Sequence, residues 1–310
     1  MGSDLFKDKT LAVMLGGTAA ERDISLESGG NVAAALTQAG AKVLRVDTAE
    51  EGWPEQLKEA SFVFNLLHGP GGEDGTVQGL FELMNLPYSG SGVLGSALTM
   101  DKVRTKLVWQ GAGFPTPAFT RLTAATEWAA VIAELGPVFV KPALEGSSLG
   151  MSKASTAQAL AEAYQKAAVY GGDVLAEQFV SGNEYTVAIL NGRALPSIRI
   201  EVPGEFYDFD AKYQSDETRF SCPSGLSAED EAALGTLAIS AFDAVGGAVW
   251  GRVDVIRDTR GAWQLLEVNT VPGMTSHSLV PMSARAAGIS LTELLSEILL
   301  GSLEVRHVRP

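Results

Sequence analysis

The stretch that most constrains this chain is residues 250–278, which combines a strand pattern with paired acidic side chains. Its first part alternates, so that Arg252 and Asp254 share one face of an expected strand. Turn-forming residues follow, and a second run is typical of the returning strand. If the connecting loop has two or four residues, antiparallel pairing puts Glu267 and Asn269 on the face that carries Arg252 and Asp254.

Two carboxylates, an amide and a guanidinium on one face favour a particular chemistry. Oxygen ligands without His or Cys suit a hard cation, and Mg²⁺ commonly binds one or two carboxylates together with substrate phosphates. Arg252 could then hold charge that develops on a transferring phosphoryl or acyl oxygen. A surface hairpin with cross-strand ion pairs is the structural alternative, and a glycosidase acid/base pair is a second one. Glycosidase chemistry needs neither Asn269 nor Arg252.

Composition and charge limit the classes of protein that remain. The chain has 310 residues, 46% of them hydrophobic, which suits two or three modules with substantial cores. A net charge of −14 argues against nucleic acid or an anionic membrane as partner. A single cysteine, Cys222, excludes an internal disulfide framework and fits a reducing compartment. Because residues 1–10 are polar and no apolar run is long enough to span a bilayer, we expect a cytoplasmic protein.

The first module, residues 1–99, is predicted to be a Rossmann-like half domain. An apolar strand at residues 11–15 precedes Gly-Gly and a helical pattern that runs to about residue 39. Glu21 lies where ligands bind in open α/β sheets, although residues 18–21 also fit a helix-capping box. His68 stands between a strand and a glycine-rich loop; it is either a structural residue that closes the strand or part of a ligand site.

The second module, residues 100–181, carries candidate nucleotide-binding residues. A predicted strand ends at Lys141, just before a Gly/Ser loop at residues 145–153. Such a loop can cradle phosphates, or it can be a flexible hairpin. A later strand carries Glu177 and leads into residues 179–180, an apolar pair that could line an adenine slot.

The third module, residues 182–310, contains the hairpin described above. A long segment without clear periodicity, residues 202–225, precedes a predicted helix at residues 228–245. A loop of that length is either disordered or a functional lid, and its aromatic content favours a lid. A final amphipathic helix is expected at residues 291–300.

The order of motifs along the chain is informative as a set. It comprises Gly16-Gly17 with Glu21, His68-Gly69, Met100-Asp101-Lys102, Lys141-Pro142 with residues 146–150, Lys212-Tyr213, residues 251–254, residues 267–270 and residues 272–275. Over nearly the whole chain this order resembles that of bacterial D-alanine–D-alanine ligases. The resemblance implies an α/β (α+β) chain with the ATP-grasp fold and an N-terminal Rossmann-like domain. The expected domains are residues 1–99, residues 100–181 and residues 182–310, with the lid at about 202–225.

The resemblance also implies an activity and its ligands. Members of the family join two D-alanine molecules with ATP for peptidoglycan synthesis, through an acyl phosphate. ATP and Mg²⁺ are the implied cofactors, with two ions expected and Mn²⁺ as a possible substitute, and a homodimer is expected. The chain departs from the family's pattern at Leu144, Gln178 and Val271, which affects details of the phosphate loop and not the reaction class.

The residue roles implied by the resemblance fall into four groups. The nucleotide-binding residues are Lys102, Lys141, Ser148, Glu177, Phe179, Val180 and Glu184, and the metal ligands are Asp254, Glu267 and Asn269. The substrate-binding residues are Glu21, His68, Lys212, Ser278 and Leu279, and the catalytic residues are Glu21, Ser147, Tyr213, Arg252 and Gly273.

Three rival functions differ from this interpretation. A depsipeptide ligase that takes D-lactate as second substrate is disfavoured by Tyr213, because such relatives lack the Lys-Tyr pair on the lid. A catalytically silent nucleotide-binding protein of the same fold should lack some of the four hairpin residues, and all four are present. A Rossmann oxidoreductase is disfavoured by the absence of a G-x-G-x-x-G motif.

Overall fold

The first module is built on a small parallel sheet. The computed structural model describes residues 5–146, 149–202 and 218–307. Strands pair in the order β2-β1-β3, and the apolar central strand is buried along almost its whole length. The elements are β1 (Thr10–Leu15), α1 (Arg22–Gln38), β2 (Lys42–Asp47), α2 (Trp53–Gln56), η1 (Leu57–Glu59), β3 (Phe62–Asn65), α3 (Thr76–Leu83) and α4 (Val93–Met100).

The second module is an antiparallel sheet covered by helices. Its strands run in the order β4-β7-β5-β6, so that the strands carrying Lys141 and Glu177 are direct neighbours. The Gly/Ser segment connects β5 to β6, which pair as a hairpin. The elements are α5 (Lys102–Gly111), β4 (Phe119–Leu122), α6 (Trp128–Leu135), β5 (Val138–Pro142), β6 (Ser152–Ala154), α7 (Ala157–Ala168) and β7 (Val174–Gln178).

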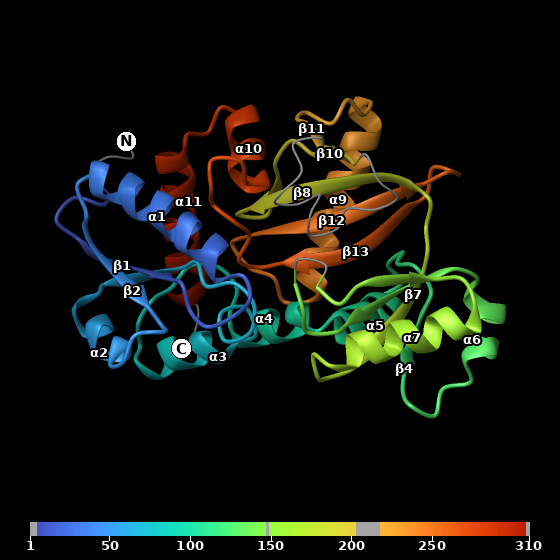
Figure 1. The fold of residues 1–310 in the computed structure, drawn as a ribbon. Coiled ribbons are helices and arrows are strands. Elements are labelled where there is room, and N and C mark those ends of the chain that lie inside the picture. Colours follow the sequence, from blue (N-terminus) through green and yellow to red (C-terminus); the bar gives the residue numbers. More distant parts are fainter. Residues whose placement is uncertain (1–4, 147–148, 203–217, 308–310) are drawn as a thin grey trace.

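The third module holds the largest sheet. Its main path is β11-β10-β8-β12-β13, and β9 pairs with β8. In Figure 1 this sheet lies above the second one, and both are to one side of the first module. The elements are β8 (Gly182–Leu190), β9 (Arg193–Ala194), β10 (Ile198–Glu201), β11 (Arg219–Ser221), α9 (Ala228–Ala244), β12 (Trp250–Asp258), β13 (Trp263–Asn269), α10 (Leu279–Ala286) and α11 (Leu291–His307).

The predicted hairpin register is confirmed. Residues 259–262 connect β12 to β13, and Arg252 lies opposite Asn269 while Asp254 lies opposite Glu267. The register shifts immediately after Asp254, where an irregularity interrupts the pairing. The four polar residues therefore lie on one face, as the alternation indicated.

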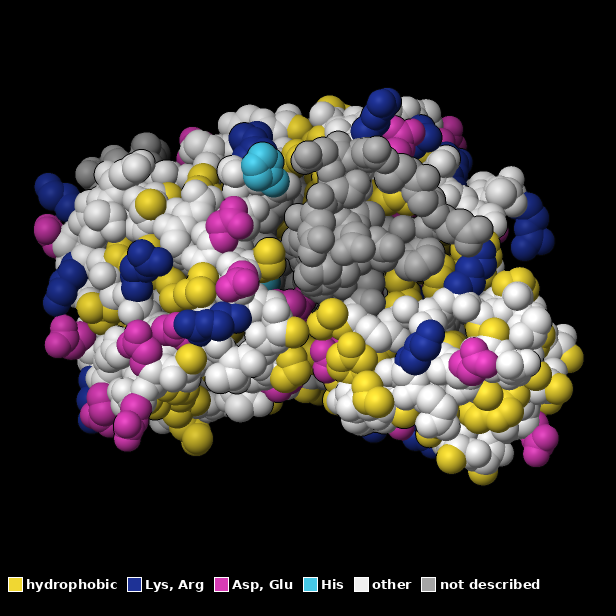
Figure 2. Space-filling model, in the orientation of Figure 1, with side chains coloured by type: hydrophobic (Ala, Val, Ile, Leu, Met, Phe, Trp, Pro, Cys, Tyr) yellow, Lys and Arg dark blue, Asp and Glu magenta, His cyan; other side chains and the backbone are white. Residues whose placement is uncertain are grey.

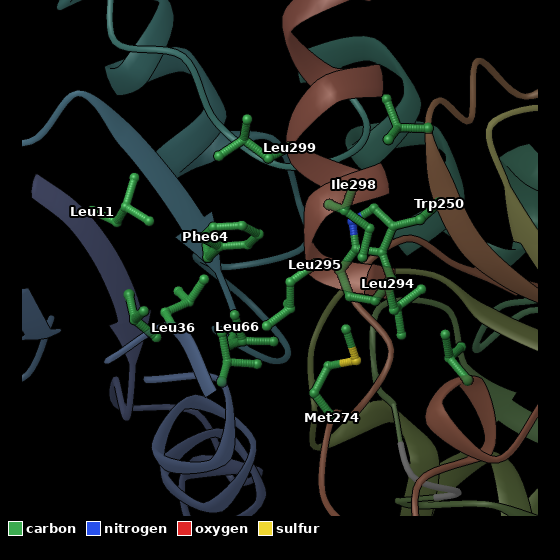
Figure 3. Close-up of a cluster of buried hydrophobic side chains, with 14 of the residues drawn as sticks. Leu11, Leu36, Phe64, Leu66, Trp250, Met274, Leu294, Leu295, Ile298 and Leu299 are labelled. Atoms are coloured by element: carbon green, nitrogen blue, oxygen red, sulfur yellow. The ribbon is translucent and has the colours of Figure 1, made fainter. Parts of the chain in front are cut away.

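The last helix of the chain returns to the first module. Leu294, Leu295 and Ile298 of α11 are almost fully buried in one core with side chains of β1, α1 and β3. Figure 3 shows these side chains facing Phe64 and Leu66 across the cluster. Because this core joins the two ends of the sequence, the N-terminal sheet is packed against the end of the third module.

Some predicted elements were wrong in detail. Alternation at residues 185–189 predicts a strand with a partner strand over residues 194–201, but this partner is divided into β9 and β10. Strand β11 lies within the segment predicted as a lid. Helix α4 was not predicted. Among the described residues no single helix is long and apolar enough to cross a membrane, although the bent pair α10 and α11 together meets that criterion by length and composition. Ser147, Ser148, Lys212 and Tyr213, four of the predicted site residues, lie outside the described residues.

Candidate active site

A cavity of about 510 Å³ lies between the second and third sheets. Residues from both sheets line it, together with Lys102 at the start of α5. Eight of the residues predicted to bind nucleotide or metal are brought together here: Lys102, Lys141, Glu177, Phe179, Val180, Glu184, Asp254 and Glu267. A space of this size, with lysines and carboxylates at its wall, is large enough for a nucleotide.

The hairpin face at the cavity carries a tight ion pair. Arg252 Nε and Nη2 each lie 2.8 Å from one carboxylate oxygen of Asp254. Thr186 on the neighbouring strand β8 donates its hydroxyl to Asp254 Oδ1 at 2.6 Å. Asn269 Oδ1 accepts the Val271 N–H at 2.9 Å, which orients the amide. From the sequence we expect Arg252 to hold charge on a transferring phosphoryl or acyl oxygen, whereas here it binds both oxygens of Asp254.

Lys102 joins the hairpin to the Gly/Ser segment. Its Nζ lies 3.3 Å from Glu267 Oε2 and donates a hydrogen bond of 2.7 Å to the Glu145 carbonyl. Asp101 caps the helix that presents Lys102, since its side chain accepts the Arg104 N–H. The lysine therefore lines the cavity in contact with strand β13 of the third sheet and with the loop after β5 of the second.

A charge cluster borders the cavity, and two of its members, Lys106 and Glu177, are almost fully buried. Lys141 Nζ is 2.8 Å from Glu177 Oε1, and Lys106 Nζ is 2.5 Å from Glu177 Oε2. Burial opposes ionisation of Glu177, but the two ammonium groups outweigh it and hold the pKa of that carboxyl below its usual range. Burial lowers the pKa of Lys106, whereas for Lys141 the attraction of Glu177 outweighs burial and raises the pKa.

An aromatic wall borders the same cavity. Phe139 and Phe179 meet edge to face with their ring centroids 5.4 Å apart. Lys153 Nζ lies 4.0 Å from the centre of the Phe179 ring. Both phenylalanines line the cavity, so a flat apolar ring system would have a surface to pack on.

Glu21 lies between two glycine loops at the edge of the first module. A Cβ on Gly69 would come within 2.9 Å of Glu21 Oε2, and one on Gly146 within 2.7 Å of Oε1. A side chain at either position would displace the Glu21 carboxylate, and at Gly69 the positive φ of 69° also favours glycine. The capping-box alternative is wrong, because Glu21 itself is the N-cap of α1 and makes no side-chain capping bond. Its carboxylate instead faces the loop that follows Lys141.

His68 and Glu73 lie beside Glu21. His68 is 7% exposed, and neither ring nitrogen has a well-formed hydrogen bond within the described part of the chain. Burial lowers the pKa of His68. Glu73 accepts the Gly69 N–H at 2.7 Å, and burial, reinforced by the nearby carboxylate of Glu21, raises its pKa to about 8.

Gly273 and Ser278 form a second small cluster at the start of α10. A Cβ on Gly273 would lie 2.8 Å from Ser278 Oγ. Ser278 is the N-cap residue, and its Oγ accepts the Thr275 N–H at 3.0 Å. Leu279 begins the helix, so its backbone N–H is among those at the helix N-terminus that can bind a carboxylate.

The three departures from the family pattern have local explanations. Gln178 donates its side-chain N–H to the Leu135 carbonyl at 3.2 Å, at the end of α6. Val271 is buried and contributes through its backbone N–H to Asn269. Leu144 is 38% exposed. Of these three residues, only Gln178 is among those that line the cavity.

Lys106, Glu73 and Thr186 were not among the residues predicted from the sequence. Val103, Lys106 and Trp109 are all buried and recur at helical spacing on α5, so periodicity could have placed Lys106 on the buried face of its helix. Glu73 stands within the glycine-rich loop that was singled out for His68. Thr186 carries no sequence signal of its own, because its contact with Asp254 depends on strand pairing.

The hairpin provides oxygen ligands of the type that Mg²⁺ prefers. Asp254, Glu267 and Asn269 supply two carboxylates and one amide oxygen, and substrate phosphates and water commonly complete such a shell. Within the described ranges, no group of three or more His, Cys, Asp or Glu residues is placed to hold a metal. A metal at Asp254 would therefore rely on non-protein oxygens and would share the carboxylate with Arg252.

Two family models and several relatives match this chain. The model for the D-ala D-ala ligase C-terminus matches residues 108–300, and the N-terminus model matches residues 46–91. A D-alanine–D-alanine ligase of Halorhodospira halophila is 57% identical over 93% of this chain and 94% of its own length. One of Alcanivorax borkumensis is 54% identical over 95% of this chain and 94% of its own length.

Solved structures of D-alanine–D-alanine ligases resemble this chain in fold. A D-alanine–D-alanine ligase of Bacillus anthracis in complex with ATP superimposes on this chain with a TM-score of 0.87 and is 31% identical in sequence. The superposition covers 97% of this chain and 100% of the other. The class defined by fold and site is an ATP-grasp enzyme with an N-terminal parallel-sheet domain. Within that class, the chain belongs to the D-alanine–D-alanine ligase family.

Proposed function

We propose that this protein joins two D-alanine molecules into D-alanyl-D-alanine for peptidoglycan synthesis, converting ATP to ADP and inorganic phosphate. The observation that carries the proposal is that the predicted nucleotide-binding residues and Glu21 lie next to the same cavity. One cavity borders Lys102, Lys141 and the hairpin carboxylates, while Glu21 approaches Gly146, next to the cavity-lining Glu145. A nucleotide and a small amino acid could therefore lie close enough to react.

Nucleotide binding is assigned to the cavity residues. Lys102 and Lys141 would hold phosphate oxygens, and Glu177 with residues 179–180 would hold the adenine. Glu184 would bind the ribose. Mg²⁺ on Asp254, Glu267 and Asn269 would neutralise charge on the phosphates when bound. Ser148 of the Gly/Ser loop is also proposed to bind the nucleotide, and this assignment rests on the sequence alone.

The first step is assigned to the region around Glu21. Glu21 would hold the ammonium group of the first D-alanine, with His68 nearby. The carboxylate of this D-alanine attacks the γ-phosphorus of ATP, the bond to the β–γ bridging oxygen breaks, and ADP leaves. The product is an acyl phosphate of D-alanine.

The second step forms the peptide bond. Lys212, Ser278 and the Leu279 N–H would hold the carboxylate of the second D-alanine. Its amine attacks the acyl carbon and loses a proton, and inorganic phosphate leaves. Arg252 and the Gly273 N–H would stabilise the oxyanion. Arg252 binds Asp254 through Nε and Nη2 only, so its other N–H groups can donate to the oxyanion.

Water must be excluded while the acyl phosphate exists. Ser147 and Tyr213 are proposed to join Glu21 in a hydrogen-bond network that orders the lid over the site. Gly146, which lies against Glu21, would bring the start of this network to the substrate.

The protein is also proposed to act as a cytoplasmic homodimer, without a nucleic-acid or membrane partner. Leu83, Val93 and Leu94 on α3 and α4 give the first module exposed apolar side chains that a second copy could cover. On the face drawn in Figure 2, basic and acidic side chains are interspersed. Light scattering after size-exclusion chromatography tests the dimer.

Phosphate release tests the proposed function. Purified protein with MgATP is given D-alanine, L-alanine, D-alanine plus D-lactate, or no amino acid. We expect release only where D-alanine is present, with the dipeptide as product. Asp254→Ala should reduce the rate at least about a hundredfold, whereas Glu162→Ala on the exposed face of α7 should not change it. ATP binding without stimulation by any amino acid would favour the silent nucleotide-binding protein, and a depsipeptide product would favour the D-lactate ligase.

A further inference from the structure

Lys106 belongs to the charge cluster but not to the cavity wall. Its side chain is 1% exposed, and the residues that line the cavity include its ion-pair partner Glu177 but not Lys106 itself. Beyond Glu177, its Nζ lies 2.6 Å from Thr116 Oγ1 and 3.4 Å from the Leu265 carbonyl. Lys106 therefore donates hydrogen bonds to Thr116 and Leu265, and it is joined to Glu177 as an ion pair.

The three partners of Lys106 come from separate parts of the fold. Glu177 is on β7 of the second sheet, Leu265 is on β13 of the third, and Thr116 is in the segment that leads to β4. Thr116 Oγ1 also donates to the Leu265 carbonyl at 2.8 Å. The cation is therefore held where the two sheets that enclose the cavity meet.

Counting charges shows what Lys106 adds. Glu177 is a single buried carboxylate with one oxygen toward Lys141 and the other toward Lys106. If Lys141 were the only partner, the pair would be neutral and Lys141 would have little attraction left for phosphate. With both lysines the cluster carries one net positive charge. Of the two lysines in the cluster, only Lys141 lines the cavity, so the net positive charge faces the cavity at Lys141.

We propose that Lys106 is a positioning residue that neutralises Glu177 from behind, so that Lys141 offers its full positive charge to the phosphates of the bound nucleotide. This inference rests on the proposed function, because it takes the cavity to be the ATP site. Lys106 touches neither substrate nor reacting atoms and acts through Glu177.

A purely structural role makes a different prediction. If Lys106 only supports the local fold, its loss should weaken adenosine and ATP alike, because the whole cavity would be distorted. If it sets the charge of the cluster, the loss should grow with the number of phosphates. The ratio of the dissociation constants for adenosine and ATP therefore separates the two roles.

The experiment measures binding of ATP, ADP and adenosine by calorimetry at one fixed Mg²⁺ concentration, without D-alanine. Lys106→Met should lower the affinity for ATP about tenfold, as expected for loss of one charge several ångströms away, and leave adenosine nearly unchanged. The double variant Lys106→Met/Glu177→Gln restores one net positive charge, so its ratio should return toward the wild-type value. Lys166→Met, an exposed lysine on α7, is the matched control and should bind all three ligands normally.

The possible results are distinguishable. The inference would be overturned if Lys106→Met loses affinity for ATP and adenosine equally, or if it keeps the wild-type ratio. It would also be overturned if the double variant discriminates against ATP more strongly than Lys106→Met does. If Lys106→Met does not fold in a thermal unfolding assay, Lys106→Gln, which keeps a hydrogen-bond donor, should show the same selective loss of ATP. A wild-type protein that fails to bind ATP would overturn the proposed function as well, whereas dipeptide synthesis with an unchanged ratio would overturn only the role of Lys106.

Discussion

Glu73 shows how a single side chain near the substrate site affects stability. Its carboxylate is held at the Gly69 N–H, close to the carboxylate of Glu21. Burial is the main cause of its raised pKa, and the charge of Glu21 adds to it. A D-alanine ammonium group placed between the two carboxylates would relieve this repulsion, which fits the proposed position of the first substrate.

The pH dependence of unfolding follows from that pKa. In the unfolded chain Glu73 loses its proton near pH 4.5, and in the folded protein near pH 8. Between these values the folded protein binds more protons, so raising the pH favours unfolding. Glu73→Gln should remove this contribution, and the variant should gain stability relative to wild type as the pH rises from about 5 to about 8.

Urea unfolding at several pH values measures the difference. Glu134→Gln replaces an exposed carboxylate on α6 and serves as the control, which should run parallel to wild type. A constant difference between Glu73→Gln and wild type across this range would contradict a raised pKa of Glu73.

Individual residues also show what could be predicted from sequence. The common face of Arg252, Asp254, Glu267 and Asn269 followed from alternation and loop length alone. The ion pair that joins Arg252 to Asp254 could not be predicted in the same way, because the hairpin face was interpreted with a metal ion on its carboxylates. Lys106 was passed over because a lysine in a helix is usually solvated, and only packing across three segments buries it.

At the scale of elements, α5 carries two of the site's lysines. Asp101 is 6% exposed and caps the helix by accepting the Arg104 N–H at 3.0 Å, one residue before Lys102. The cap therefore determines where the first turn begins and where Lys102 is directed. It also pairs with the Arg104 side chain.

Removing this cap should destabilise the protein. Asp101→Ala is expected to lower the free energy of unfolding by about 1 kcal/mol and to weaken ATP binding, because the first turn loses its acceptor. Asp101→Asn keeps a side-chain oxygen and should retain most of the stability. Chemical denaturation of the three proteins at pH 7 gives the comparison, and equal stability of the Ala and Asn variants would show that the cap contributes nothing.

Elements with strong periodicity or clear ends were predicted well. Strand β1 and helix α9 agree closely with their predicted ranges, and β5 and β7 are the strands predicted to carry Lys141 and Glu177. Helix α4 was missed because it follows the Ser-Gly-Ser-Gly run at residues 89–92, which is typical of a connection, and because its sequence is rich in small residues. Strand β11 was missed because it is only three residues long and pairs with β10, a contact that no local pattern reveals.

At the scale of the whole molecule, the chain closes on itself. Helix α11 buries Leu295 and Leu299 against the first module, and Trp250 of β12 belongs to the same core (Figure 3). The first module, which carries Glu21 and His68, is thus packed against the module that carries the hairpin. Contacts between segments so far apart in sequence cannot be inferred from periodicity, and here the resemblance to a family supplied the overall fold.

The proposed reaction requires that oxygen pass from one D-alanine to phosphate. The most direct test supplies D-alanine labelled with ¹⁸O in its carboxylate, together with MgATP, and analyses both products by mass spectrometry. We predict D-alanyl-D-alanine and inorganic phosphate that carries one ¹⁸O atom from the attacking carboxylate. Unlabelled phosphate, or phosphate released without dipeptide, would contradict ligation through an acyl phosphate.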